Sequence, residues 1–344
     1  MKISFKNDYS EGAHPAILEA LLQTNRQQQP GYGLDDYSQQ AKALIRERIG
    51  NPQAEIFFVS GGTQANLLVL GHVLRPHESI IACQGAHIAD HETGAIEAVG
   101  HKIHLAPSDN GKLTPEQIRD YASRYTNVPH QVQPRLVYIT QTTEIGTLYS
   151  LAELKAIWQS CQELGLLLYM DGARLAQALS AEGNDIGWED LARYTDIFYI
   201  GATKCGALLG EAIVFNQAAL ADYFSFYIKQ KGALLAKGRL LGLQFLTLFQ
   251  NSLYEELGRV ANTQMKRIKE AFVAKGIGFL SDTCTNQLFP ILTERQIAQL
   301  SADFDFYLWQ KVDAEHTAIR LITSWATEDS QVEALLRVIE GLTP

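Results

Sequence analysis

The sequence predicts an α/β protein with a large, doubly wound, mainly parallel sheet domain and a smaller C-terminal α+β domain. Three observations indicate this class. The chain has 344 residues, more than one typical core organises, so a large and a smaller domain are expected. Short apolar runs alternate with helical patterns up to about residue 230, as in a series of βαβ units. Beyond about residue 245 helices mix with scattered strand candidates, so the predicted domains are residues 1–245 and 246–344.

The elements of the large domain are indicated by apolar runs between helical segments. The clearest helix spans residues 150–164, because Ser150 and Glu153 form a capping box and a glycine follows the last apolar turn. Residues 166–170 are then continuously apolar, as in a strand that is buried on both faces of a parallel sheet. That strand ends on Asp171. The other strands of this domain are expected at 56–59, 79–82, 102–106, 135–140 and 196–201.

The C-terminal part has a different pattern. Strand candidates lie at 277–280, 288–292 and 319–322 between helical segments, which predicts a small α+β domain. A helical stretch from residue 216 to about residue 251 precedes it. This stretch is apolar enough to connect the two domains or to pack against a partner subunit.

The composition argues against several classes of function. The formal net charge is -9, whereas nucleic-acid binding depends on clustered Lys and Arg, so no nucleic-acid partner is expected. No apolar run of about 20 residues could span a membrane, and the first residues lack the apolar stretch of a secretory signal. A cytoplasmic location without membrane contact is therefore expected. The four cysteines form no CxxC pair, so we expect free thiols, with neither disulfides nor a metal site.

Polar residues follow the predicted strands at their carboxyl ends, where ligands bind in open parallel sheets. After the strand at 56–59, Gly61, Gly62 and Thr63 let the backbone approach a ligand and begin a helix whose free N–H groups would bind phosphate. By itself a Gly-Gly turn is more often only a turn, and this one does not match the GxGxxG pattern. His87 follows the next strand and could lie flat on a cofactor ring, although a lone loop histidine is usually structural.

Asp171 and Lys204 extend the same series. Asp171 ends the strand at 166–170 with Arg174 three residues later, and Lys204 comes shortly after the strand at 196–201. Alone, such a carboxylate is as often a helix cap, and most lysines are solvated surface charges. Together the series matches pyridoxal 5'-phosphate, which requires an amine for an imine, an acid beside its ring nitrogen, a phosphate cradle and usually a stacking ring. We therefore expect this cofactor.

These motifs resemble those of the threonine aldolase family, within the β-eliminating lyase group of fold-type-I pyridoxal-phosphate enzymes, which have an aspartate-aminotransferase-like fold. The resemblance covers nearly the whole chain and is strongest at residues 87–94, residues 171–174 and the strand leading to Lys204. It implies that Lys204 carries the cofactor as a Schiff base and that His87 stacks on the cofactor ring. It also implies that Asp171 binds the ring nitrogen and that the glycine turn holds the phosphate.

The resemblance further implies a substrate pocket shared between subunits. Arg174 and Arg320 would bind the carboxylate of an amino-acid substrate, a task that suits guanidinium, and Arg174 would also border the cofactor. Asn7 and Tyr32 would contribute to substrate binding. Lys237 lies near the position of a family arginine that binds phosphate in the neighbouring subunit, although other basic residues nearby compete for this role. A homodimer or homotetramer with the site at the subunit interface is therefore expected.

Two positions depart from the family pattern. Asn7 stands where the family usually has Ser. Residues 140–144 are Thr-Gln-Thr-Thr-Glu where the family commonly has Glu-Asn-Thr-His-Asn, so Thr143 takes the place of a His that lies near the substrate's β-hydroxyl. This difference leaves open whether threonine is the substrate and which stereoisomer is preferred.

The function predicted is retro-aldol cleavage of a β-hydroxy-α-amino acid, such as threonine, allo-threonine or phenylserine, to glycine and an aldehyde. A base would take the β-hydroxyl proton, and the two candidates are His87 and an ordered water. The alternatives are β-elimination or transamination with the same cofactor, because the fold does not decide which bond to Cα breaks. A non-catalytic pyridoxal-phosphate or small-molecule binding protein is the remaining alternative.

Overall fold

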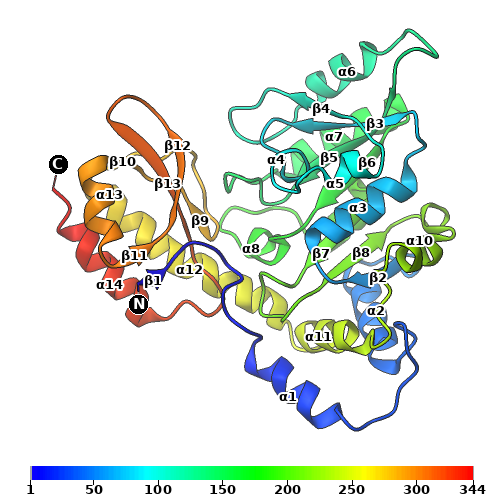
Figure 1. Ribbon diagram of the computed structural model, residues 1–344, viewed down its shortest axis with the longest axis horizontal. Helices are drawn as coiled ribbons and strands as arrows, with labels where there is room; N and C mark the ends of the chain where they lie inside the picture. Colours follow the sequence, from blue (N-terminus) through cyan, green and yellow to red (C-terminus); the bar gives the residue numbers. More distant parts are fainter. Residues whose placement is uncertain (1, 344) are drawn as a thin grey trace.

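The structure is a computed structural model that describes residues 2–343, and it has two lobes (Figure 1). A seven-stranded sheet with its helices forms the larger lobe, and a four-stranded sheet with two C-terminal helices forms the smaller one. The predicted α/β class with a large, mainly parallel sheet is confirmed. No helix within residues 2–343 combines the length and the apolar character needed to cross a bilayer.

The large sheet is mainly parallel, with one strand of opposite direction. In spatial order its strands are β2 (Glu55–Val59), β8 (Glu211–Phe215), β7 (Ile197–Gly201), β6 (Leu167–Asp171), β5 (Gln133–Thr140), β3 (Glu78–Cys83) and β4 (Ile103–Ala106). Neighbouring strands from β7 to β4 pair in parallel, whereas β8 is antiparallel to both of its neighbours. Every strand predicted for this sheet is present, and β8 is an addition that the sequence pattern did not indicate.

Local sequence signals begin and end several helices of the larger lobe. The predicted helix at 150–164 is α7 (Leu151–Leu164), which begins at the predicted capping box and ends at Gly165, where φ is 65°. Thr114 begins α6 (Pro115–Ser123) with a second capping box. The other helices of this lobe are α1 (Pro15–Thr24), α2 (Asp36–Arg48), α3 (Gly62–Val73), α4 (His87–Asp90), α5 (Ala95–Ala98), α8 (Leu175–Leu179), α9 (Trp188–Tyr194), α10 (Phe224–Gln230) and α11 (Arg239–Gln250).

The prediction of one long helical stretch from 216 to about 251 is wrong. A short 3-10 turn, η1 (Ala218–Ala221), and the two helices α10 and α11 occupy this region instead. Gly232 has a φ of 70°, a left-handed conformation that no helix interior accepts, and residues 231–238 are not helical. The α11 helix packs against α1 and α2, so it belongs to the larger lobe. The connection between the lobes is the next helix, α12 (Leu253–Ala274), as Figure 1 shows.

Within residues 2–343 the smaller lobe contains six strands, three helices and the N-terminal segment. Its helix α12 contacts α8 at one end and α14 at the other. The strand candidate at 319–322 is confirmed, the one at 288–292 divides at Pro290, and 277–280 forms only a single bridge from Phe279. The elements are β9 (Gln287–Leu288), β10 (Ile291–Thr293), α13 (Glu294–Ser301), β12 (Tyr307–Lys311), β13 (His316–Ile322) and α14 (Asp329–Glu340), with β1 (Ile3–Ser4) paired to β11 (Phe304–Asp305).

Each lobe has its own apolar core. The larger core surrounds the seven-stranded sheet, and the smaller one gathers buried side chains of α12, β9, β10, β13 and α14. Phe5 is buried in the smaller core, so the N-terminal segment packs with the C-terminal lobe before the chain crosses to α1. The domain boundary expected at 245/246 stays a prediction.

Candidate active site

A cavity of about 770 Å³ lies between the lobes, at the carboxyl ends of β6 and β7. One wall comes from the large sheet and the loops that follow its strands, and the other comes from β12 and β13 of the smaller lobe. Most of the residues predicted from the sequence to form the site line it. These residues are Gly61, Gly62, Thr63, His87, Asp171, Arg174, Lys204 and Arg320.

The N-terminus of α3 opens into this cavity and forms its anion site. Gly61 is the N-cap, its backbone is extended, and no side chain caps the first N–H groups of the helix. A Cβ at position 62 would lie only 3.0 Å from the hydroxyl of Tyr199, and Gly62 avoids this close contact. Free N–H groups and the positive end of the helix dipole together favour a bound anion such as phosphate.

Asp171 is the most fully hydrogen-bonded acid of the site. Its Oδ1 accepts from the hydroxyl of Tyr199 at 2.5 Å and from the backbone N–H of Ala173 at 2.9 Å. Its Oδ2 accepts from the hydroxyl of Tyr138 at 2.6 Å and from Asn66 at 3.3 Å. Burial raises the pKa of both tyrosines well above 10, so the phenols remain donors. The carboxylate is thereby held in one orientation at the end of β6.

His87 is fixed by a carboxylate that connects it to Asp171. Its Nδ1 lies 2.8 Å from Oε1 of Glu92, and the same oxygen accepts from Asn66 at 2.7 Å. Asn66 in turn reaches Asp171, so one amide links the imidazole and the acid of the site. Burial alone would lower the pKa of His87, but the bond to Glu92 and the nearby carboxylates outweigh it and raise that pKa above its ordinary value.

Lys204 lies at the inner wall of the cavity, shortly after β7. The backbone turns there at Gly206, whose φ is 83°, and the carbonyl of Lys204 accepts from Gln177 at 3.1 Å. Burial and the positive charge of Arg174 lower the pKa of Lys204, although several carboxylates oppose them. A lysine with a lowered pKa has a larger neutral fraction, which is the form that attacks a carbonyl.

Arg174 is already paired within the protein. Its Nε and one terminal nitrogen bind the two carboxylate oxygens of Asp8 at 2.7 and 3.1 Å. Asn286 donates to the same carboxylate at 2.9 Å, and Asp8 is completely buried. Burial by itself raises the pKa of Asp8, but Arg174 and Lys204 outweigh it and lower that pKa. Two hydrogen-bond donors of Arg174 are therefore occupied by Asp8 of the N-terminal segment.

Arg320, unlike Arg174, is not engaged by a carboxylate of the described residues. Its guanidinium lies over the rings of Tyr307 and Trp309, 4.9 and 4.7 Å from their centroids. Its Nε is buried and has no hydrogen-bond partner among residues 2–343. The two arginines predicted as an equivalent clamp thus differ, because Arg174 is ion-paired with Asp8 whereas Arg320 forms no ion pair among residues 2–343.

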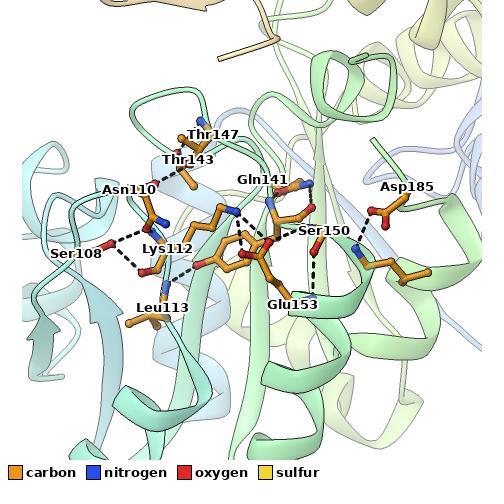
Figure 2. A network of polar contacts seen from close by, with 12 residues as sticks. Ser108, Asn110, Lys112, Leu113, Gln141, Thr143, Thr147, Ser150, Glu153 and Asp185 are labelled. Atoms are coloured by element: carbon orange, nitrogen blue, oxygen red, sulfur yellow. Dashed lines mark hydrogen bonds and ion pairs between the residues drawn. The ribbon is translucent and has the colours of Figure 1, made fainter. Parts of the chain in front are cut away.

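The loop between β5 and α7 places Glu144 in the cavity and turns Thr143 away from it. The hydroxyl of Thr143 lies 2.7 Å from that of Thr147, which donates to the carbonyl of Asn110 at 2.7 Å (Figure 2). At the ends of the loop, Gln141 exchanges two hydrogen bonds with the backbone of residue 149. Thr142 and Glu144, on either side of Thr143, therefore line the cavity, whereas the family resemblance had pointed to residue 143.

Three residues predicted for the site lie outside this cavity. Asn7 binds the backbone N–H of Tyr9 at 3.0 Å through its side chain, and Tyr9 lines the cavity in its place. Tyr32 and Lys237 are exposed and lie close to each other, because the N–H of Tyr32 donates to the carbonyl of Ala236 at 3.1 Å. Their roles stay predictions.

Sequence reasoning did not select several residues that build the site. Tyr138 and Tyr199 each stand between apolar residues of their strands, and that isolated polarity was an available signal. Glu92 stands five residues after His87 and lies within the segment 87–94 of the family resemblance, which was the available signal for it. Asp8 and Glu211 carried no local signal, because each acts through contacts with distant segments.

The two-lobed arrangement is the aspartate-aminotransferase-like fold. An aspartate aminotransferase variant from Thermus thermophilus superposes with a TM-score of 0.74 at 15% identity, over 99% of this chain and 91% of that chain. A threonine aldolase from Leishmania major superposes with a TM-score of 0.97 at 46% identity, over 98% of this chain and 99% of that chain.

The family follows from sequence. The low specificity L-threonine aldolase of Pseudomonas aeruginosa is 33% identical over 342 residues, 97% of this chain and 96% of that protein. The sequence model of the beta-eliminating lyase family matches residues 6–291. The chain belongs to the beta-eliminating lyase family, and the lyase class expected from the sequence is confirmed.

Proposed function

We propose that this protein is a pyridoxal-phosphate-dependent aldolase that cleaves a β-hydroxy-α-amino acid to glycine and an aldehyde. The observation that carries the proposal is the convergence, in one cavity, of an amine with a lowered pKa, a fixed carboxylate, an open helix N-terminus and an unpaired arginine. Relatives that are named threonine aldolases support this choice of reaction.

The residues of the cavity fit the cofactor. Lys204 would hold it as an imine, Asp171 would face its ring nitrogen, His87 would lie on the ring, and the N-terminus of α3 would bind its phosphate. Buried polar atoms without partners, including Nε of Arg320, also fit a site that is completed by polar ligands. When bound, pyridoxal phosphate supplies a sink for the electron pair released at Cα.

The protein's own side chains would orient the substrate and move its proton. Arg320 would bind the substrate carboxylate, and Arg174, held by Asp8, would add a second positive charge behind it. The bond between His87 and Glu92 occupies Nδ1, which leaves Nε2 to accept the proton of the β-hydroxyl. The carboxylate of Glu92 would then stabilise the imidazolium. An ordered water is the alternative acceptor.

A substrate panel tests the reaction. Threonine, allo-threonine and phenylserine are incubated with purified protein, and aldehyde and glycine are both quantified. Equal amounts of the two products, together with their loss in Lys204→Ala, are expected. Pyruvate or another keto acid as product would instead show β-elimination or transamination. A protein that holds the cofactor but converts none of these compounds would disprove the proposed reaction.

We also propose a homodimer or homotetramer with the site near a subunit interface, in the cytoplasm. Tyr32 and Lys237 support this arrangement, because they lie together on the surface, away from the cavity of their own chain. Exposed apolar side chains on the same lobe, Leu22, Tyr223 and Phe226, are 72%, 78% and 73% accessible and would be covered in such an assembly. Light scattering after size exclusion tests this assembly, and a fully active monomer would contradict it.

A further inference from the structure

Glu211 is a buried acid in the cavity wall that the proposed reaction does not use. It is the first residue of β8 and pairs with Val59 on one side and with Gly201 on the other. Val59 directly precedes the turn that begins α3, and Gly201 precedes the segment that carries Lys204. The carboxyl group therefore enters the cavity between the anion site and the lysine, and its residue is 4% exposed.

Only one oxygen of this carboxyl group is hydrogen-bonded. Oε1 accepts from the hydroxyl of Thr203 at 2.9 Å, and that hydroxyl in turn accepts from the N–H of Gly210 at 3.0 Å. Oε2 is buried and has no hydrogen-bond partner in the part of the chain that the structure describes. An ionised carboxylate with an unsatisfied buried oxygen is costly, whereas a protonated one could carry its O–H on Oε2, as a donor still available to a ligand.

The charges around Glu211 favour the protonated form. Burial is the main cause that raises the pKa of Glu211 to about 8. The negative charge of Asp171 adds to this rise, while the hydrogen bond from Thr203 and the charge of Lys204 oppose it. The other titratable groups that face it are the phenols of Tyr169, Tyr199 and Tyr254, and burial raises the pKa of each well above 10. Near neutral pH Glu211 is therefore mainly un-ionised, and its O–H has no acceptor among the described residues.

We propose that Glu211, in its un-ionised form, donates a hydrogen bond from Oε2 to the phosphate group bound at the N-terminus of α3. This inference rests on the proposed function, which supplies the phosphate. The same geometry excludes an ionised Glu211 from this role, because a carboxylate with no donor to offer would repel the anion. Glu211 is thus a positioning residue whose protonation completes the anion site.

The experiment compares two ligands that differ only in the phosphate. The full-length apoprotein is titrated with pyridoxal 5'-phosphate and with pyridoxal, and Kd is measured by intrinsic fluorescence at pH 7. A hydrogen bond to a charged group predicts that Glu211→Ala weakens pyridoxal phosphate binding about 10- to 100-fold. Pyridoxal binding should change little. Glu211→Gln keeps a neutral donor and should bind pyridoxal phosphate with most of the wild-type affinity. Such binding also shows that Glu211→Gln is folded.

The pH dependence gives a second readout. Above about pH 8 the preference for pyridoxal phosphate over pyridoxal should fall in the wild type as Glu211 ionises, and stay level in Glu211→Gln. Asp196→Asn is the matched control, because Asp196 is a buried acid directly before β7 that accepts from the N–H of Leu168 outside the cavity. It should bind both ligands like the wild type.

Two results would overturn the inference. One is an equal loss of affinity for both ligands in Glu211→Ala, and the other is a pH step that persists in Glu211→Gln. A wild-type apoprotein that binds no pyridoxal phosphate at all would be a different failure, because it would remove the proposed function itself.

Discussion

Removing the charge of Asp8 should destabilise the fold strongly. Asp8→Asn preserves the shape of the side chain but leaves Arg174 as a buried cation without its counter-ion. Both groups are buried, and two hydrogen bonds of 2.7 and 3.1 Å join them. Breaking a buried pair by removing one partner costs about 3–5 kcal/mol, so we expect a loss of that size in the free energy of unfolding.

Urea unfolding at pH 7, followed in parallel by fluorescence and circular dichroism, measures this loss. The pH dependence has a definite sign. The pKa of Asp8 is lowered in the folded protein, so its contribution is complete above the unfolded value of about 3.9 and disappears as the pH falls through the folded value. The difference between wild type and variant should therefore be constant from about pH 5 to pH 8 and shrink below about pH 4.

An exposed ion pair of the same region serves as control. Lys6 and Asp305 lie 3.6 Å apart with side chains 36% and 48% exposed, so Asp305→Asn should cost less than about 1 kcal/mol. The double variant Asp8→Asn/Arg174→Gln should recover part of the stability, because it removes the uncompensated charge. A loss in Asp8→Asn no larger than that in Asp305→Asn would refute the reasoning.

Further substitutions test the cavity. Arg320→Gln should raise the KM for an amino-acid substrate about 10- to 100-fold with a smaller change in kcat, and steady-state kinetics with an unaltered KM would exclude Arg320 from carboxylate binding. Glu92→Gln should move the acid limb of the pH–rate profile to lower pH, because the bond to Glu92 raises the pKa of His87. If the limb stays in place, His87 is not the base. Glu144→Gln should lower kcat by about tenfold, whereas Thr143→Val, turned away from the cavity, should not; equal effects would contradict the assigned orientations.

The residues that end buried strands were predictable from sequence. A continuous apolar run such as 166–170 specifies a central parallel strand, and the polar residue after it must lie at the ligand-binding edge of the sheet. Asp171 and the Gly61-Gly62 turn were located in this way. The prediction of Lys204 was less certain, because the residues next to it form no recognisable motif. Only its position in the series of residues that follow strands identified it.

The remaining features depend on contacts that no local pattern records. Asp8 is defined by Arg174, a residue 166 positions away, so reasoning from the sequence selected its neighbour Asn7 instead. The choice between Thr143 and Glu144 depends on the hydrogen bond between Thr143 and Thr147 and on the bond that Thr147 donates to the carbonyl of Asn110 in a distant loop. The strand β8 begins with a buried acid, and an acid is an unusual start for a central strand, which explains why Glu211 was not selected.

The stacking of Arg320 has a consequence for spectroscopy. Trp309 is the only tryptophan among the described residues that line the cavity, and its indole contacts the cation expected to bind the substrate carboxylate. Neutralising that cation changes the electric field at the indole, so the emission of Trp309 should shift when a carboxylate arrives. The protein thus contains an intrinsic optical probe of ligand entry, which would separate the rate of binding from the rate of bond cleavage in a stopped-flow experiment.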